Sequence, residues 1–139
     1  MLDVTAPADE IGITTLAAAA RAATRGLGGD GDAAGMLVRL VAEDARRRLS
    51  GGEEAAEIQM HVAEEGTELS ITLRDRGAPI AGPPSSVLAL LDLGVASRID
   101  GQHDAHGNRT EVRLALPEHH AVVEHGEVEV LTDEAALSD

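Results

Sequence analysis

One carboxylate with unusual neighbours is the first candidate for chemistry in this sequence. Asp75 ends a run, residues 69–73, in which apolar and polar residues alternate, and Gly77 and Pro79 follow it. The alternation predicts a buried strand, and the glycine and proline make the chain leave the sheet as a shaped loop. An acid at a strand end beside such a loop can accept a hydrogen bond from a ligand. Because Asp-x-Gly is also ordinary turn chemistry, the residues alone leave both interpretations open.

A second candidate is Glu43, on a stretch with apolar residues at helical spacing. Arg39 and Arg47 stand one helical turn to either side of it. The plainest interpretation is an exposed ladder of ion pairs, each contributing a few tenths of a kcal/mol. The other interpretation is a functional carboxylate. The residues alone do not separate the two.

The histidines give no convincing metal pattern. His103 and His106 flank Asp104, and a further group of histidines lies between residues 119 and 125. Neither set has the four-ligand spacing of a structural metal site. The chain has no Cys, and no Ser-His-Asp arrangement has a supporting context. We therefore expect no metal ligands among these residues.

Periodicity and turn residues predict the elements that must position Asp75 and Glu43. They predict an α+β domain, a two-layer sandwich with a mixed β-sheet and helices on one face. The expected elements are a strand at 2–5, a helix from the cap Asp9 to Gly26, a helix from the cap Asp32 to Leu49, strands at 58–62 and 69–75, a helix capped by Ser85 or Ser86 that ends near Gly94, and a hairpin of 96–100 and 108–116 joined across 101–107.

Length and composition predict one folded domain and an acidic extension. The chain has 139 residues and no Phe, Tyr or Trp, so its core must be built from aliphatic residues and Met. We expect the domain to span residues 1–117. Residues 118–139 hold seven acids and no Lys or Arg, a composition typical of a flexible tail or a linker.

The charge of the chain limits the kinds of partner that it is expected to bind. The formal net charge is −14, which repels nucleic acids and anionic membranes and favours a basic protein surface. Residues 1–50 hold 7 of the 25 acids and 6 of the 11 arginines, so a bound nucleotide would meet this less acidic part. Without Cys or an apolar leader at the N-terminus, we expect a cytoplasmic protein that binds neither nucleic acid nor membrane.

Three segments together resemble the ATP-binding domain of the GHKL superfamily, which includes gyrase and histidine kinases. They are the helix that contains Val41-Ala42-Glu43, the strand that ends in Asp75-Arg76-Gly77, and the last strand, residues 107–117. The likeness is to the anti-sigma-factor serine-kinase branch and spans residues 2–117. It implies a Bergerat-like ATPase fold, in which ATP or ADP lies between the sheet and a lid.

The resemblance keeps the adenine side of such a site. It implies that Asp75 is the adenine-reading acid, with Gly77 as the glycine that follows it and Thr110 as a residue that assists at the same edge. It also implies that Glu43 stands where the family carries its general base.

The phosphate side departs from the family. Arg47 occupies the position of an Asn that ligates magnesium, and a guanidinium cannot ligate a cation. We therefore do not expect Mg²⁺ binding. We expect Arg47 to pair with Glu43 and, if a nucleotide binds, to contact its phosphates directly. Residues 82–87, Gly-Pro-Pro-Ser-Ser-Val, also lack the glycines that wrap phosphates.

These features favour a degenerate anti-sigma-kinase-like regulatory domain, not an enzyme, with weak or lost adenine-nucleotide binding. It would act through a protein partner, such as a sigma factor or an antagonist of an anti-sigma factor, and a homodimer is compatible with the resemblance. Two alternatives stay open. One is an active ATP-dependent serine kinase with Glu43 as base, and the other is a domain that regulates a longer fused protein.

Overall fold

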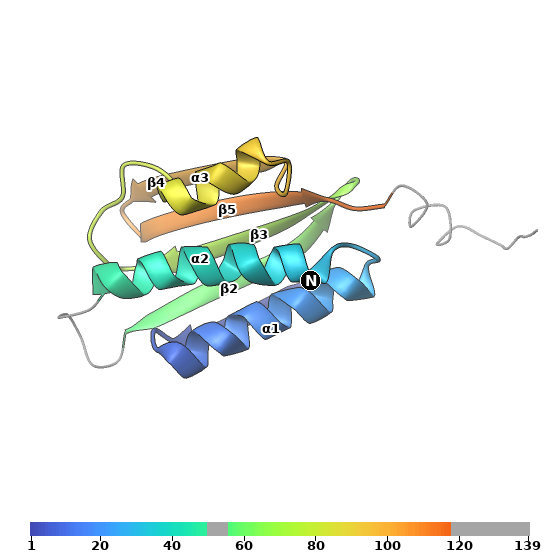
Figure 1. Cartoon of the computed structure of the whole chain (residues 1–139). Coiled ribbons are helices and arrows are strands. Elements are labelled where there is room, and N and C mark those ends of the chain that lie inside the picture. The colour runs from blue at the N-terminus through green and yellow to red at the C-terminus, as the bar shows by residue number, and fades with distance from the viewer. Residues whose placement is uncertain (50–55, 118–139) are drawn as a thin grey trace, which may run out of the picture.

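The computed structural model describes residues 1–49 and 56–117 of the chain. Within these residues, three helices pack on one face of a five-stranded sheet and leave its other face uncovered (Figure 1). The predicted α+β class and two-layer architecture are thereby confirmed. In chain order the elements are β1 (Leu2–Pro7), α1 (Glu10–Gly26), α2 (Gly31–Leu49), β2 (Glu57–Glu65), β3 (Glu68–Asp75), α3 (Ser85–Asp92), β4 (Arg98–Asp104) and β5 (Gly107–Ala115).

The sheet differs in one detail from the mixed sheet that the sequence predicts. Its order is β1-β2-β3-β5-β4, and every neighbouring pair in the described sheet is antiparallel. β3 and β4 run in the same direction because both are antiparallel to β5. They are not neighbours, since β5 folds back from β4 and inserts between them. β3, which ends at Asp75, is therefore the central strand.

Helix α2 begins earlier than the sequence predicts. Its first turn is capped by Asp30, whose Oδ1 accepts a hydrogen bond from the Ala33 amide at 3.1 Å. The predicted cap, Asp32, lies inside the helix and forms ion pairs with Arg21 and Arg25 of α1. The cap of α1 is as predicted, since Asp9 accepts from the Gly12 amide at 2.8 Å.

The last hairpin and α3 also differ from the expected elements. Residues 101–104, predicted as a loop, extend β4 and pair with β5, so that the turn shrinks to two residues. Residue 84, a proline, occupies the N-cap position of α3, and neither Ser85 nor Ser86 caps the helix with its side chain. The turn-forming residue types at 101–104 are tolerated in a strand because β4 is an edge strand with only one partner strand.

The hydrophobic core lies between the helices and the sheet, and its side chains are all aliphatic apart from Met60. The alternation predicted for β3 is confirmed, because Leu69, Ile71 and Leu73 are all buried. Small residues of α1 and α2, among them Ala17, Ala20 and Ala34, let the two helices approach closely. The expected tail, residues 118–139, lies outside the described residues.

Among the described helices, none combines the length and apolar character needed to cross a bilayer. The same part of the chain contains no cluster of three or more His, Cys, Asp or Glu side chains suited to a metal ion.

Candidate functional site

Asp75 lies at the end of the central strand with its side chain on the helix side of the sheet. The side chain is 6% exposed. Its Oδ1 accepts two hydrogen bonds, from the Gly77 amide at 2.9 Å and from the Asn108 side-chain amide at 2.9 Å. Since a carboxylate oxygen has two lone pairs, both acceptor positions of Oδ1 are filled.

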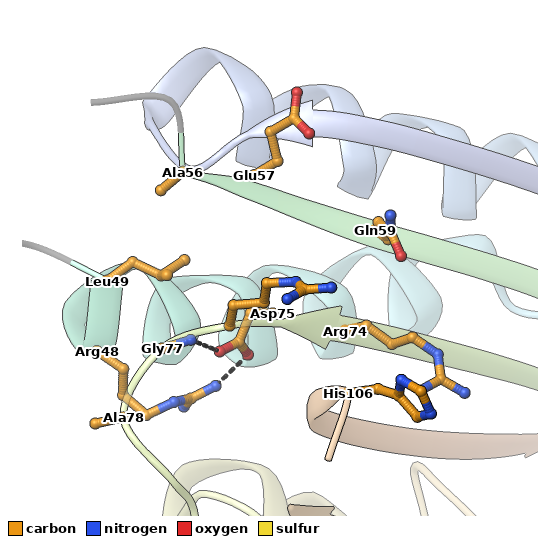
Figure 2. Close-up of a pocket in the computed structure, with 11 residues that line it drawn as sticks. Arg48, Leu49, Ala56, Glu57, Gln59, Arg74, Asp75, Gly77, Ala78 and His106 are labelled. Atoms are coloured by element: carbon orange, nitrogen blue, oxygen red, sulfur yellow. Dashed lines mark hydrogen bonds and ion pairs between the residues drawn. The ribbon is translucent and has the colours of Figure 1, made fainter. Parts of the chain in front are cut away.

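The other oxygen of Asp75 is bound by an arginine of α2. Arg48 Nη2 lies 2.5 Å from Asp75 Oδ2 (Figure 2). Nη1 of the same guanidinium bonds to Asp44. The Arg48 side chain is only 15% exposed. Its Nε is buried and has no hydrogen-bond partner among the described residues. Arg48 thus lies between two carboxylates, in contact with both, and it covers Asp75 on the side of the helices.

Asn108 organises the loop that follows Asp75. It is directly opposite Asp75 in the ladder of β3 and β5, and its side chain is buried. Besides Asp75, its amide donates to the Ala78 carbonyl at 2.9 Å and, more weakly, to the Gly77 carbonyl at 3.3 Å. Its Oδ1 accepts from the Ile80 amide at 3.1 Å. One buried side chain therefore fixes the path of residues 77–80.

Two glycines allow the chain to pass close to Asp75. A Cβ on Gly77 would lie 3.0 Å from Cβ of Arg48 and 3.1 Å from Asp75 Oδ1. Gly107 has φ of 111°, a conformation that residues with a side chain rarely adopt, and a Cβ there would overlap the Asp75 carbonyl oxygen. Gly77 is thus required for the contact between loop and helix, and Gly107 for the contact between the last hairpin and β3.

The structure brings together only part of the site that the sequence predicts. Asp75 and Gly77 lie side by side, and Thr110 is buried on β5 two residues beyond Asn108. Glu43 is 3.9 Å from Arg46, and Arg47 is 68% exposed with its Nη2 3.3 Å from Asp44. Neither of these two side chains lines the cavity beside Asp75.

The residues of α2 that face Asp75 are Asp44 and Arg48, each one position beyond the predicted pair. A helical signal existed for Arg48, because it lies three residues after Ala45 and seven after Val41, both of which are buried. Asn108 was missed as well. It lies on the same inward face of β5 as Thr110, Val112 and Leu114. A polar side chain on a buried face requires hydrogen-bond partners.

A cavity of about 560 Å³ opens beside Asp75 at the end of the sheet. Figure 2 shows that its lining side chains come from the end of α2, from β2, from the end of β3 and from the turn before β5. Its lining residues are Arg48, Leu49, Ala56, Glu57, Gln59, Arg74, Asp75, Arg76, Gly77, Ala78 and His106.

No family model matches this chain, and no curated protein matches it either. The function is therefore argued from the geometry around Asp75.

Proposed function

We propose that this domain is a regulatory module that resembles the GHKL ATPases. In this domain, the side chain of Arg48 fills the position that adenine would occupy beside Asp75. The domain binds adenine nucleotides weakly or not at all and acts through a protein partner. The observation that carries the proposal is the contact between Arg48 and Asp75 Oδ2, because this oxygen is the acceptor that an adenine amino group would need.

Energetics favour Arg48 over adenine in this position. A hydrogen bond that involves a charged group contributes about 1.5–3 kcal/mol, whereas a neutral one contributes about 1 kcal/mol net. Moving Arg48 away would also separate a largely buried ion pair, at a cost of roughly 3–5 kcal/mol when one partner is left uncompensated. An adenine amino group therefore cannot displace the guanidinium on the strength of its own hydrogen bond.

The phosphate side supports the same proposal. The loop before α3 contains Pro83 and Pro84, which have no amide hydrogen to offer a phosphate. This loop packs against β4, since a Cβ on Gly101 would lie 2.9 Å from the Pro83 nitrogen. Arg47, which the resemblance places at the position of the metal ligand, cannot ligate a cation, so these residues do not fit Mg²⁺ and ATP. Glu43 does not line the cavity, so the proposal includes no phosphotransfer.

A surface suited to a protein partner lies on α3. Among the eight residues of this helix only Val87 is buried. Leu88 and, just after the helix, Leu93 are exposed, Leu93 to 75%. Exposed apolar side chains grouped on one element are typical of protein interaction sites. With the net charge of −14, they favour a partner with a basic surface, such as the sigma factor or the antagonist of an anti-sigma factor that the resemblance implies.

The test is calorimetric titration with ATP and ADP, with and without Mg²⁺. We expect no measurable binding to the unchanged protein, or weak binding that Mg²⁺ does not alter and that Asp75→Asn diminishes. In Arg48→Met, Oδ2 of Asp75 becomes free while the position keeps an unbranched apolar stem, so adenine-nucleotide binding should increase. The increase should vanish in the double variant with Asp75→Asn.

Arg47→Met is the matched control, because Arg47 is the adjacent residue but is largely exposed and does not line the cavity. It should leave nucleotide binding unchanged. Circular dichroism establishes that each variant is folded. Tight, magnesium-dependent binding of ATP by the unchanged protein would refute the proposal, and so would an equal response of the Arg47 and Arg48 variants.

A further inference from the structure

The uncovered face of the sheet carries a row of hydrogen-bond donors that crosses every strand. Antiparallel register places one side chain per strand in this row. On β1, β2, β3 and β5 these side chains alternate with buried neighbours that face the helices, so the row lies on the other face. The row contains no acid, although the chain is strongly acidic. In spatial order it consists of Thr5, Gln59, Arg74, Arg109 and Gln102.

The centre of the row holds two arginines in direct opposition. Arg74 of β3 and Arg109 of β5 are register partners, a position in which Cβ atoms lie about 4.5–5.5 Å apart and like charges destabilise the sheet. Within residues 1–49 and 56–117, the Arg74 side chain makes no hydrogen bond or ion pair. Arg109 has a loose contact, 3.7 Å to Glu111. This arrangement leaves positive charge that the fold itself does not compensate.

Glu111 cannot fully compensate both arginines because other groups already engage it. Its Oε2 accepts from the Ser70 hydroxyl at 2.6 Å and from Arg113 Nε at 3.0 Å. These two hydrogen bonds hold the Glu111 side chain in the next register pair on this face, two residues along β5 from Arg109. The cationic centre at Arg74 and Arg109 is consequently open to an anion from solution.

Space and further cations adjoin this centre. Arg74 and Gln59 line the 560 Å³ cavity together with Arg76 and His106, while the acids of this cavity are Asp75, which Arg48 already binds, and Glu57 at its β2 side. Arg74 and Gln59 also line a second hollow of about 370 Å³ on the uncovered face. Arg76 is exposed and, like Arg74, has no ion-pair partner in the part of the chain that the structure describes. Arg74 thus stands between two hollows, with a second uncompensated arginine at the rim.

We propose that Arg74 and Arg109, with Gln59 beside them and Arg76 at the rim, form a binding site for a phosphate group. A phosphate monoester carries a charge of about −1.5 to −2 at neutral pH, which matches two opposed guanidinium groups. Each guanidinium can donate two parallel hydrogen bonds to phosphate oxygens. A single carboxylate would leave one arginine uncompensated. The site is separate from the Asp75 oxygen that Arg48 occupies, because Arg74 and Asp75 project from opposite faces of β3.

The chemistry fits both a free phosphate compound and a phosphorylated side chain of a partner. The experiment therefore titrates the full ¹⁵N-labelled chain with inorganic phosphate, with phosphoserine, and with a phosphoserine peptide beside its unphosphorylated form. Ionic strength is held constant with chloride. We expect shifts in the backbone and Nε–H signals of Arg74 and Arg109. The dissociation constant should rise about tenfold or more in Arg74→Gln and in Arg109→Gln.

Arg98→Gln is the matched control, since Arg98 is an exposed arginine of β4 on the same face, opposite Arg113 and away from the row. It should change the dissociation constant less than about twofold. Binding of all phosphate compounds would support the site and indicate a free phosphate ligand, whereas binding of the phosphopeptide alone would support it and indicate a phosphorylated partner. The proposal is overturned if none of them shifts Arg74 and Arg109, or if all three variants weaken binding equally. Any contact of ATP with this site through its phosphates should persist in Asp75→Asn and be lost in Arg74→Gln, which distinguishes it from adenine binding at Asp75.

Discussion

Truncating Asn108 should loosen the loop around Asp75 and measurably destabilise the domain. In Asn108→Ala, Asp75 loses one donor to Oδ1, while the Ala78 carbonyl and the Ile80 amide lose their partners. A buried polar group left without a partner costs about 1–3 kcal/mol. Because water reaches part of this loop, we take the low end for each group and expect a total loss of roughly 3 kcal/mol. The melting temperature should then fall by about 10 °C.

The assay is thermal and urea denaturation followed by far-ultraviolet circular dichroism, since the chain has no Trp or Tyr for fluorescence. Hydrogen exchange of the Ile80 amide should accelerate in parallel, because its acceptor is gone. Gln102→Ala, an exposed change in the same hairpin, should alter stability by less than about 0.5 kcal/mol. If Asn108→Ala were equally mild and the Ile80 amide stayed protected, Asn108 would not be the residue that holds the loop.

Two further predictions concern acid stability and backbone conformation. Burial acts to raise the pKa of Glu111, but hydrogen bonds from Ser70 and Arg113 outweigh it and hold the pKa below its usual value of 4.5. A lowered folded-state pKa means that this stabilisation is present above pH 4.5 and is lost as the pH falls through the folded-state pKa. Denaturation at a series of pH values should therefore show that the free energy of unfolding falls less steeply with acid in Glu111→Gln. An unchanged acid dependence would contradict the assignment. Gly107→Ala should cost at least about 1–3 kcal/mol in the same denaturation assay because of its positive φ and the overlap with Asp75, whereas Gly26→Ala, where a Cβ meets nothing within 4 Å, should be neutral or stabilising.

Strand periodicity was sufficient to predict β3 and its burial, because alternation of apolar residues has only one interpretation when a Gly/Pro loop follows. The end of β4 was harder to predict. Gly101, Gln102 and Asp104 are typical turn residues, and they form a strand here because β5 offers a full ladder of partners. Gly101 also has to be a glycine to admit the Pro83 backbone. A tertiary contact thus decided the conformation of residues that local propensity assigns to a loop.

The sequence predicted the main acid of the candidate site, Asp75, but it did not predict that Arg48 binds this acid. Glu43 with Arg47 and Asp44 with Arg48 have the same spacing of four residues and the same pairing of charges. The choice between them depends on the rotation of α2 against the sheet, which changes by about 100° per residue. A rotation of one residue exchanges an exposed arginine for one that reaches Asp75. Local pattern alone could not resolve that difference, whereas the burial of Val41 and Ala45 does.

The role of Asp75 therefore depends on a single oxygen. Oδ1 is filled by Gly77 and Asn108, which are fixed by the loop and the ladder, so only Oδ2 could ever serve a ligand. Arg48 binds Oδ2 and is itself held by Asp44. Loss of Arg48 would leave Asp75 without a cation and Asp44 with Arg47 as its remaining partner, and loss of either carboxylate would leave the guanidinium partly uncompensated. The three side chains are mutually dependent, so the effects of removing them should not be additive. A change that reopens Asp75 to a ligand by removing Arg48 still leaves Asp44 a partner, because Arg47 Nη2 lies 3.3 Å from its Oδ1.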